Sequence, residues 1–568
     1  MKNNKIIAIF SFIILCFTSS CTKGNSSSSG NSTTPSIVAP TTPTDKTGTS
    51  TSSSSKELPH GPQELGKSFN LMEEEDDTMT VTVTNPSSEG TKGFYSPDEV
   101  TIEKNITDYS YQSIYDWHYT PSTGKVPLLV IPVVIPGNEK KVHNDTLDII
   151  KKAFFGGDDE LNFESLHSYY YKSSYGQLDF TGLVTDFYYP KSNSNSQYKK
   201  STDLNINNLS GLVKESVDWA KDTYDLNMAD FDSDKDGTLD GVWIIYIRRV
   251  NPNDTSLYWA FTTTTSEVGT VDNPCVNTYG WAGLDFLTGD IYSDKTPDDG
   301  CDGHVLIHET GHMLGLQDYY TYSSSSYSPL GRIDMMDNNA GDQNPYSKLL
   351  LGWIKPYVVT GNATITLKSD MSKDNVIVIP YDSKSYKFDS DGKLIFNPFD
   401  EYIVIDYYSP NGLNEKDYEA YKVQTVKDRG ARVYHADTRL VKLTSNGNDQ
   451  YDVELPDDPD SFVDDNDGKY YMFVTNTESP NDSKTVESYF LSDADNSWDE
   501  IRWISANKNI LNSSSDNKGR LFENGSTFSL EDYKNQFVSS KFDNKESFSS
   551  VVLDAKQVND MIKPLNIL

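Results

Sequence analysis

Positive charge is scarce in this chain of 568 residues. Lysine and arginine number 49 against 84 aspartates and glutamates, which gives a formal net charge of -35 at pH 7. Such a surface repels phosphate backbones, so we expect no nucleic-acid partner, whereas calcium and cationic substrates are favoured. The hydrophobic share of 36% fits a soluble globular protein with long polar segments, and the length suffices for two or three domains.

The N-terminus lacks an apolar run long enough to stay in a membrane. The run Ile6–Phe17 is too short to span a bilayer as a permanent helix, and it follows Lys2 and Lys5. This pattern indicates a secretion signal over residues 1–20. The small residues before Cys21 resemble a lipoprotein processing site, which would leave Cys21 acylated. We therefore expect an extracellular protein that is anchored at the cell surface through Cys21 or, as the alternative, freely secreted.

Two segments follow the signal. Residues 21–56 consist almost wholly of serine, threonine, glycine, asparagine and proline. No hydrophobic core can form from this composition, so we expect a flexible tether. Residues 57–124 form an N-terminal region that is a candidate prosegment. Its acidic run Glu73–Asp77 is typical of a solvated loop.

Cysteine is scarce as well, because the chain has four and only Cys275 and Cys301 lie beyond the leader. Export places the protein in oxidising surroundings, so we expect a disulfide between these two residues. The bridge would hold the segment that leads into residue 308. Neither cysteine lies in residues 57–124, so a thiol of that region cannot keep an enzyme latent by binding its metal.

A short segment carries the residue types of a metal site. His308, Glu309 and His312 have the spacing of a hydrolytic zinc motif, and Gly315 and Asp318 follow them. Residues four apart share one face of a helix, so both histidines can direct a ring nitrogen at one ion, with Glu309 beside the open coordination position. Glycine adopts positive φ at little cost, so Gly315 can end the helix and turn Asp318 toward the metal as third ligand.

Three alternatives exist for this segment. His304 also falls at helical spacing, but it would lie roughly 12 Å from His312 along one helix axis, too far to bind the same ion. We therefore expect a structural or supporting role for His304. Asp334 and Asp337 are the fallback ligands. The simplest alternative is an amphipathic core helix without metal, which the added glycine and aspartate make less favourable.

A methionine-containing turn lies downstream, in residues 332–337. It fits the Met-turn that, in the metzincin superclass of zinc peptidases, lays a methionine beneath the metal ligands as an apolar floor. We favour Met336 for this position, with Met335 as the alternative. Ordinary packing in the core would use the same residues.

At this point the chain resembles the immune inhibitor A family of bacterial secreted zinc metallopeptidases. In that family aspartate replaces the third histidine of most metzincins, and snapalysin-like peptidases share this variant. Ser165–Gly176 and Lys348–Pro356 also look similar to the family. The similarity covers roughly residues 125–360 well and residues 361–568 only loosely, through Glu401–Ile405 and Arg432–His435. It implies a metzincin-like fold in which substrate lies along an edge strand above the metal helix.

Hydrophobic patterns in residues 125–360 predict strands and helices that alternate, which favours a mixed twisted sheet backed by helices. We expect strands at 126–135, 178–187 and 242–247, and helices at 147–155, 161–171 and 209–223. Residues 361–568 contain β-rich runs at 363–368, 375–380, 401–408 and 470–474, which predict a separate or closely docked β domain. The fold class expected is α+β.

A second metal signal lies before the strand at residue 242. Hard oxygen ligands alternate over residues 232–240, with glycine at the sixth position, as in a calcium loop. An EF-hand requires glutamate at the twelfth position, which is Trp243 here. We therefore predict a calcium-binding turn of another type, and the alternative is an acidic surface turn without metal. The expected side-chain ligands are Asp232, Asp234, Asp236 and Asp240, and Thr238 would offer its carbonyl.

Together these features predict a zinc metalloendopeptidase that hydrolyses extracellular proteins, with Glu309 as general base and a structural calcium ion. A monomer is expected. A surface lipoprotein that binds ligands or mediates adhesion, with a vestigial peptidase domain, is the alternative function. Degenerate peptidases usually lose the base or a ligand, whereas Glu309 and all three candidate ligands are present here.

Overall fold

The computed structural model describes most of the chain after residue 57. The described residues are 58–65, 69–84, 92–102, 106, 117–158, 160–250, 257–288, 301–320, 328–380, 386–421, 426–438, 440–445, 451–454, 469–472, 476, 499–509, 519–523, 525–529, 532–533 and 552–557. The predicted signal, Cys21 and the tether lie outside them. Among the helices of the described part, none is both long and apolar enough to cross a membrane. The architecture is α+β, with several sheets and few helices.

A five-stranded sheet forms the first half of the structure, in the order β5-β4-β6-β8-β7. Neighbouring strands are parallel except for β7, which runs antiparallel to β8 at one edge. The strands with long apolar runs, β4 and β6, lie inside the sheet and are almost fully buried, as both faces are covered. The strands are β4 (Gly124–Val134), β5 (Leu178–Val184), β6 (Gly241–Ile247), β7 (Phe261–Thr264) and β8 (Thr278–Gly283).

Helices pack against this sheet and against each other. Helix α5 (His304–Met313) contacts β7 and β8 as well as α2 (Leu166–Ser173), and α2 in turn contacts β5 and α1 (Thr146–Phe155). Helix α3 (Leu209–Tyr224) packs on β4, and the short α4 (Leu284–Leu287) follows β8. The helix predicted from residue 161 begins five residues later, because the Ser165 side chain caps the first turn by accepting from the Ser168 amide.

A six-stranded sheet dominates the second half, in the order β18-β14-β13-β11-β9-β2. Its pairs are antiparallel, except that β9 and β11 are parallel. This confirms the β-rich C-terminal part, including the strands predicted at 375–380 and 401–408. The strands are β2 (Phe94–Tyr95), β9 (Tyr357–Val359), β11 (Val376–Pro380), β13 (Glu401–Tyr408), β14 (Gly430–Asp437) and β18 (Ile501–Ile504).

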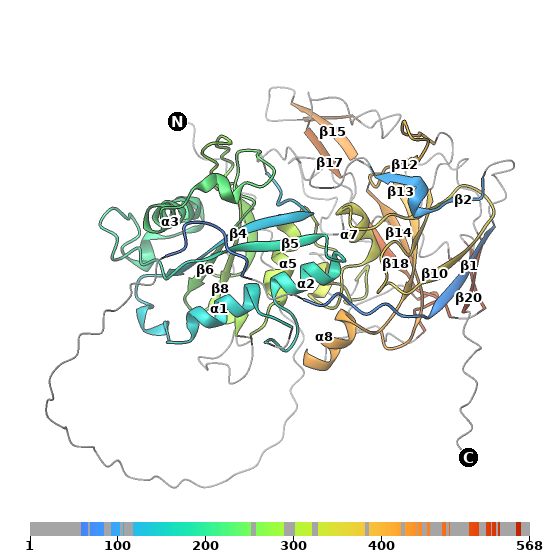
Figure 1. Ribbon diagram of the computed structural model, residues 1–568, viewed down its shortest axis with the longest axis horizontal. Coiled ribbons are helices and arrows are strands. Elements are labelled where there is room, and N and C mark those ends of the chain that lie inside the picture. The colour runs from blue at the N-terminus through green and yellow to red at the C-terminus, as the bar shows by residue number, and fades with distance from the viewer. Residues whose placement is uncertain are drawn as a thin grey trace, which may run out of the picture.

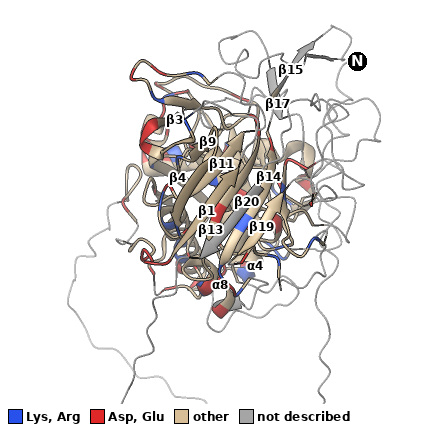
Figure 2. Cartoon of the chain, turned by 90° about the vertical axis from the view of Figure 1, so that its right-hand side faces the viewer, with Lys and Arg blue, Asp and Glu red and all other residues tan. Residues whose placement is uncertain are grey.

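A four-stranded sheet packs against the outer face of the six-stranded sheet, in the order β10-β1-β20-β19. Side chains alternate along a strand, so Val404 of β13 faces the first half of the molecule while Ile403 and Ile405 face β1 and β10. Figure 2 turns this side toward the viewer and shows both acidic and basic residues on it. The strands are β1 (Thr78–Thr84), β10 (Ala363–Lys368), β19 (Ser526–Ser529) and β20 (Val552–Gln557).

Smaller elements complete the described part. Strand β3 (Val100–Ile102) pairs with β12 (Leu394–Phe396), and β15 (Leu440–Ser445) lies between β16 (Tyr451–Glu454) and β17 (Lys469–Met472). The remaining helices of the described part are α6 (Met335–Asn338), α7 (Pro345–Leu350) and α8 (Leu413–Tyr421). One buried cluster runs from the five-stranded sheet through α5 and α7 into β11 and β13. The C-terminal part is therefore closely docked on the first half (Figure 1).

The N-terminal region, residues 57–124, is built into both halves. Strand β1 is inserted between β10 and β20, and β2 extends the six-stranded sheet. The acidic run expected to be a solvated loop is instead partly engaged, because both Glu75 oxygens accept from the Arg429 guanidinium at 2.6 Å. Arg429 also lies 3.0 Å from Asp77. Burial opposes ionisation of Glu75, but these contacts lower its pKa.

The predicted disulfide between Cys275 and Cys301 is wrong for this structure, in which both cysteines are unbonded. Cys275 lies just before β8, where its amide donates to Gly237. Cys301 lies beyond α4, at the other end of β8, and its thiol donates to the Ile149 carbonyl at 3.3 Å. Six strand residues span roughly 20 Å, whereas a disulfide requires Cα atoms within about 7 Å.

Candidate metal centre

The three predicted zinc ligands lie together at the end of α5. Their ligand atoms are all within 4.8 Å of one another. Asp318 Oδ1 lies 3.0 Å from His308 Nε2 and 3.3 Å from His312 Nε2, and the two imidazole rings are perpendicular. All three side chains are mostly shielded from solvent. Two imidazole nitrogens and one carboxylate form a donor set of the kind that can hold a zinc ion.

Backbone geometry at Gly315 brings Asp318 to the histidines. Helix α5 ends at Met313, and the Leu316 amide then donates to the Gly311 carbonyl at 3.0 Å. Gly315 has φ +99°, a conformation that favours glycine. A Cβ there would also meet Ile106 at 3.1 Å, so a larger residue has little space. The turn that the sequence predicted at this glycine is confirmed.

The other ring nitrogen of each histidine is held by a backbone carbonyl. His308 Nδ1 bonds to the Met335 carbonyl and His312 Nδ1 to the Leu316 carbonyl, both at 2.8 Å. A neutral imidazole that donates from Nδ1 presents a lone pair at Nε2, which is the form that binds a metal. These contacts therefore orient both Nε2 atoms toward Asp318.

Methionines form a floor beneath the helix. Asp334 caps α6 by accepting from the Met336 amide at 2.9 Å, and the Met336 side chain then lies under Gly311. A Cβ on Gly311 would come within 2.4 Å of the Met336 sulfur, so a larger residue there would force the methionine side chain to shift. Met335, the alternative, contributes its carbonyl to His308. Met336 is thus the methionine whose side chain approaches Gly311.

Opposite charges on Asp318 and the two histidines stabilise each other. Burial would raise the pKa of Asp318, but the two histidines lower it well below its usual range. Burial would likewise lower the pKa of His312, yet the Asp318 charge raises it to about 9. Asp318 is therefore ionised near neutral pH, and its negative charge favours the positively charged form of His312.

Glu309 lies on the same helix and is buried, which raises the pKa of its carboxyl group. Its backbone carbonyl accepts from Thr262 Oγ1 of β7 at 2.8 Å. The edge strand β7 is thus tied to the helix at the residue predicted to act as base. A carboxyl group with a raised pKa beside a metal site is suited to accept and return a proton.

His304 and the fallback aspartates stand apart from this group. The His304 ring lies between Asp302 Oδ1 at 2.6 Å and Asp417 Oδ1 at 2.9 Å, and it stacks on Phe163. Burial disfavours its charge, but the two carboxylates raise its pKa to about 10. Asp334 serves as the α6 cap, and Asp337 Oδ2 accepts from Ser328 and the Arg332 amide.

The loop before β6 gathers part of its predicted ligand set. Ligand atoms of Asp232, Asp234 and Asp240 lie within 4.8 Å of one another. Asp236 is not part of this group, because its carboxylate accepts from Thr238 and pairs with His118. Burial, with the nearby aspartates, raises the pKa of Asp240 to about 8 and that of Asp234 to about 6. A divalent cation among these oxygens would offset their repulsion.

Some supporting residues were not identified from the sequence. Tyr170 donates from its hydroxyl to the Ile307 carbonyl at 2.6 Å, and Thr262 donates to Glu309. Asp417 reaches His304 across 113 positions of sequence. Tyr170 lies within the aromatic run Tyr169–Tyr171, which is a local signal in the sequence, whereas nothing local marks Thr262 or Asp417.

The chain was compared with known proteins in two ways. A scan against protein-family models and a search of curated proteins both found no match to the chain.

Proposed function

We propose that this protein is a zinc-dependent endopeptidase that acts on extracellular proteins. The observation that carries the proposal is the convergence of His308, His312 and Asp318 on one point, beside the buried Glu309. Histidine and carboxylate ligands with an open position are typical of hydrolytic zinc sites. The residues present fit zinc because both Nε2 atoms are oriented by carbonyl contacts at Nδ1.

Each residue has a defined role in the proposed reaction. His308, His312 and Asp318 would hold the ion, which when bound would supply Lewis acidity and lower the pKa of a water toward ~7. Glu309 accepts the proton of the attacking water at its carboxylate and delivers it to the nitrogen of the leaving amine. The Thr262 contact to the Glu309 carbonyl keeps β7 beside this carboxylate. The Met336 side chain packs against Gly311, beneath the helix that carries the two histidines.

The proposed fold of this half is metzincin-like. Support comes from the mixed sheet with one antiparallel edge strand, the glycine turn that follows the helix, and the methionine beneath it. An extended peptide can add to a sheet edge through main-chain hydrogen bonds. We place the substrate along β7, because this edge strand is the one tied to the metal helix.

Two further proposals concern the surroundings of the enzyme. Asp232, Asp234 and Asp240 are the residues that would hold a structural calcium ion.

The N-terminal signal and Cys21 lie outside the described residues, and we propose lipid anchoring at Cys21 from their sequence alone. Mass spectrometry of the mature N-terminal peptide tests the anchor. An unmodified Cys21, or a start further downstream, would indicate free secretion.

Metal analysis combined with a protease assay tests the proposed function. The purified protein should contain about one zinc per chain and cleave casein, and a chelator should abolish the cleavage until zinc is restored. A chain that holds no zinc, or casein cleavage that a chelator leaves unchanged, would contradict the proposal. A binding or adhesion protein with a vestigial site would fail both measurements.

A further inference from the structure

Helix α8 of the C-terminal part reaches the metal helix through one carboxylate. Asp417 lies in α8 and is fully buried. Its Oδ1 lies 2.9 Å from His304 Nε2, and its Oδ2 accepts from the Gly341 amide at 2.6 Å. Both oxygens are therefore used by residues of the first half, and Figure 1 places α8 close to α2, below the end of the sheet.

The two partners of Asp417 flank the proposed zinc site along the chain. His304 is the first residue of α5, one helical turn before His308. Gly341 follows shortly after α6, which carries Met336. A single carboxylate thus joins the start of the ligand helix to the segment that leaves the methionine floor.

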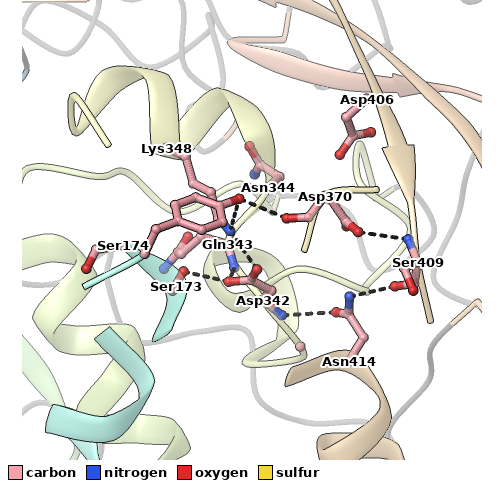
Figure 3. Close-up of polar contacts among 12 residues, drawn as sticks. Ser173, Ser174, Asp342, Gln343, Asn344, Lys348, Asp370, Asp406, Ser409 and Asn414 are labelled. Carbon is pink, nitrogen blue, oxygen red and sulfur yellow. Dashed lines mark hydrogen bonds and ion pairs between the residues drawn. The ribbon is translucent and has the colours of Figure 1, made fainter. Parts of the chain in front are cut away.

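A second residue of α8 supports the same segment. Asn414 Oδ1 accepts from the Asp342 amide at 3.1 Å, and Asn414 Nδ2 donates to the Ser409 carbonyl at 3.1 Å. A Cβ on Gly341 would lie 2.5 Å from Asn414 Oδ1, so the glycine, at φ +67°, permits this approach. Figure 3 shows Asn414 between Asp342 and Ser409.

Asp342 links this contact to the interior of the first half. Its carboxylate accepts from Ser173 at 2.5 Å and from Lys348 at 2.6 Å (Figure 3). Lys348 is buried, so its ammonium group depends on this partner. The segment after α6 is therefore fixed from α2 and α7 on one side and from α8 on the other.

We infer that Asp417 is a positioning residue for the proposed zinc site, and that the C-terminal part completes the active site through α8. The inference rests on the proposed function and adds a role for the second half of the chain. Loss of Asp417 would remove the carboxylate at His304 Nε2 and the acceptor of the Gly341 amide, and would free the first turn of α5 to shift. Displacements of about 1 Å at reacting groups reduce turnover by up to about 100-fold.

The test compares Asp417→Ala with a matched control in the full-length protein. Glu401 and His435 form another buried histidine–carboxylate pair in the C-terminal part, at 2.9 Å. Glu401→Ala removes that pair, which joins β13 to β14 within the six-stranded sheet, and should cost a comparable amount of thermal stability. The readouts are kcat and KM on a casein-derived peptide, zinc content, melting temperature, and the visible absorption of the cobalt-substituted protein.

For Asp417→Ala we expect kcat to fall about 10- to 100-fold, with KM changed by less than about threefold, while zinc stays near one per chain. The cobalt absorption bands should shift, because they report ligand geometry. Asp417→Asn keeps one carbonyl oxygen as acceptor and should recover part of the lost kcat. Glu401→Ala should keep the wild-type kcat and cobalt spectrum.

The outcomes separate this inference from the proposed function. A wild-type protein without zinc or cleavage overturns both. An active wild type whose Asp417→Ala variant matches Glu401→Ala in kcat and cobalt spectrum overturns the inference alone. If Asp417→Ala does not fold, Asn414→Ala removes only the hydrogen bonds of one side-chain amide. This variant should show a smaller fall in kcat and a smaller shift of the cobalt bands. Unchanged kcat and spectrum in Asn414→Ala would then overturn the inference.

Discussion

Glu309 is the residue whose chemical role can be isolated most cleanly, because it lies beside the ligands without being one of them. Glutamine has the same shape but cannot accept a proton. We expect Glu309→Gln to retain zinc and to lower turnover by about two or more orders of magnitude, the usual scale for loss of general-base assistance. Peptide turnover and zinc analysis on the same preparation measure this. Near-normal activity would contradict the assignment.

Asp318 and His304 provide a second comparison at the residue scale. Asp318 contacts both His308 and His312, whereas His304 contacts two other carboxylates at the N-terminal end of α5. Asp318→Ala should therefore lose most of its zinc, while His304→Ala should keep it even if its turnover falls. Equilibrium dialysis against zinc buffers measures both. The reverse pattern in zinc content would rule out Asp318 as third ligand.

Local spacing explains what the sequence predicted at this scale. His308, His312 and Asp318 lie within eleven consecutive residues, so helix periodicity and one glycine turn determine their approach. The partners of His304 depend on tertiary structure, since Asp417 lies 113 positions away. The cysteine pairing failed for the same reason, because redox context predicts that thiols pair but does not place Cys275 and Cys301 at opposite ends of β8.

The acidic loop that leads into β6 is an element with its own expected ligand. Asp232 and Asp240 are buried close to Asp234, so without a cation their charges repel. Millimolar calcium should raise the melting temperature by binding the folded state, and Asp234→Ala should remove most of this response. Thermal unfolding with and without calcium measures the effect. Asp391→Ala, in an exposed turn of the C-terminal part, serves as the control.

Glu500, the residue before strand β18, has a fully buried side chain. Glu500 accepts from the Tyr346 hydroxyl at 2.8 Å, and burial raises its pKa to about 8. A raised carboxyl pKa means that the folded state holds a proton that the unfolded state has released. Its contribution to stability is therefore full below about pH 4.5 and is lost as the pH rises toward about 8.

Glu500→Gln mimics the protonated form at every pH. We expect this variant to melt a few degrees above wild type at pH 8 and close to wild type at pH 5. Thermal unfolding at both pH values measures the difference. An equal difference between variant and wild type at the two pH values would contradict the link to this carboxyl group.

Elements differ in how much of their position the sequence reveals. Strands β4 and β6 are continuous apolar runs and were predicted within a few residues. Strands β7 and β8 were missed, since FTTT and TYGWAG have neither a long apolar run nor a clear alternation. Their place depends on neighbours: a Cβ on Gly280 would come within 2.6 Å of Trp243, which explains a glycine in mid-strand.

At the scale of the whole molecule, the N-terminal region holds the two halves together. Gln63 exchanges backbone hydrogen bonds with Gly182 at the edge of the five-stranded sheet, whereas β1 lies inside the four-stranded sheet. Ile106 is fully buried against Gly315, the turn that presents Asp318. From the sequence alone, residues 57–124 are a candidate prosegment. Local sequence could not reveal that β1 pairs with strands about 280 and 470 positions later.

These contacts lead to a prediction about truncation. Deleting residues 1–56 removes only the predicted signal and tether, so the remaining protein should fold and keep its activity. Deleting residues 1–84 also removes β1, which leaves β10 and β20 without their partner and takes Met79, Val81 and Val83 from a buried cluster. Edge exposure and the loss of buried apolar side chains should make this variant aggregate or unfold at a much lower temperature.

Soluble yield, thermal unfolding and casein cleavage distinguish the two truncations. A removable prosegment would give the opposite result, with the 1–84 deletion stable and more active than the full-length protein. Supplying residues 57–84 as a separate peptide provides a stricter control, because a strand needed for the fold should restore stability when added back. If instead the added peptide lowers the activity of a stable truncated protein, residues 57–84 act as an inhibitor rather than as part of the β sandwich.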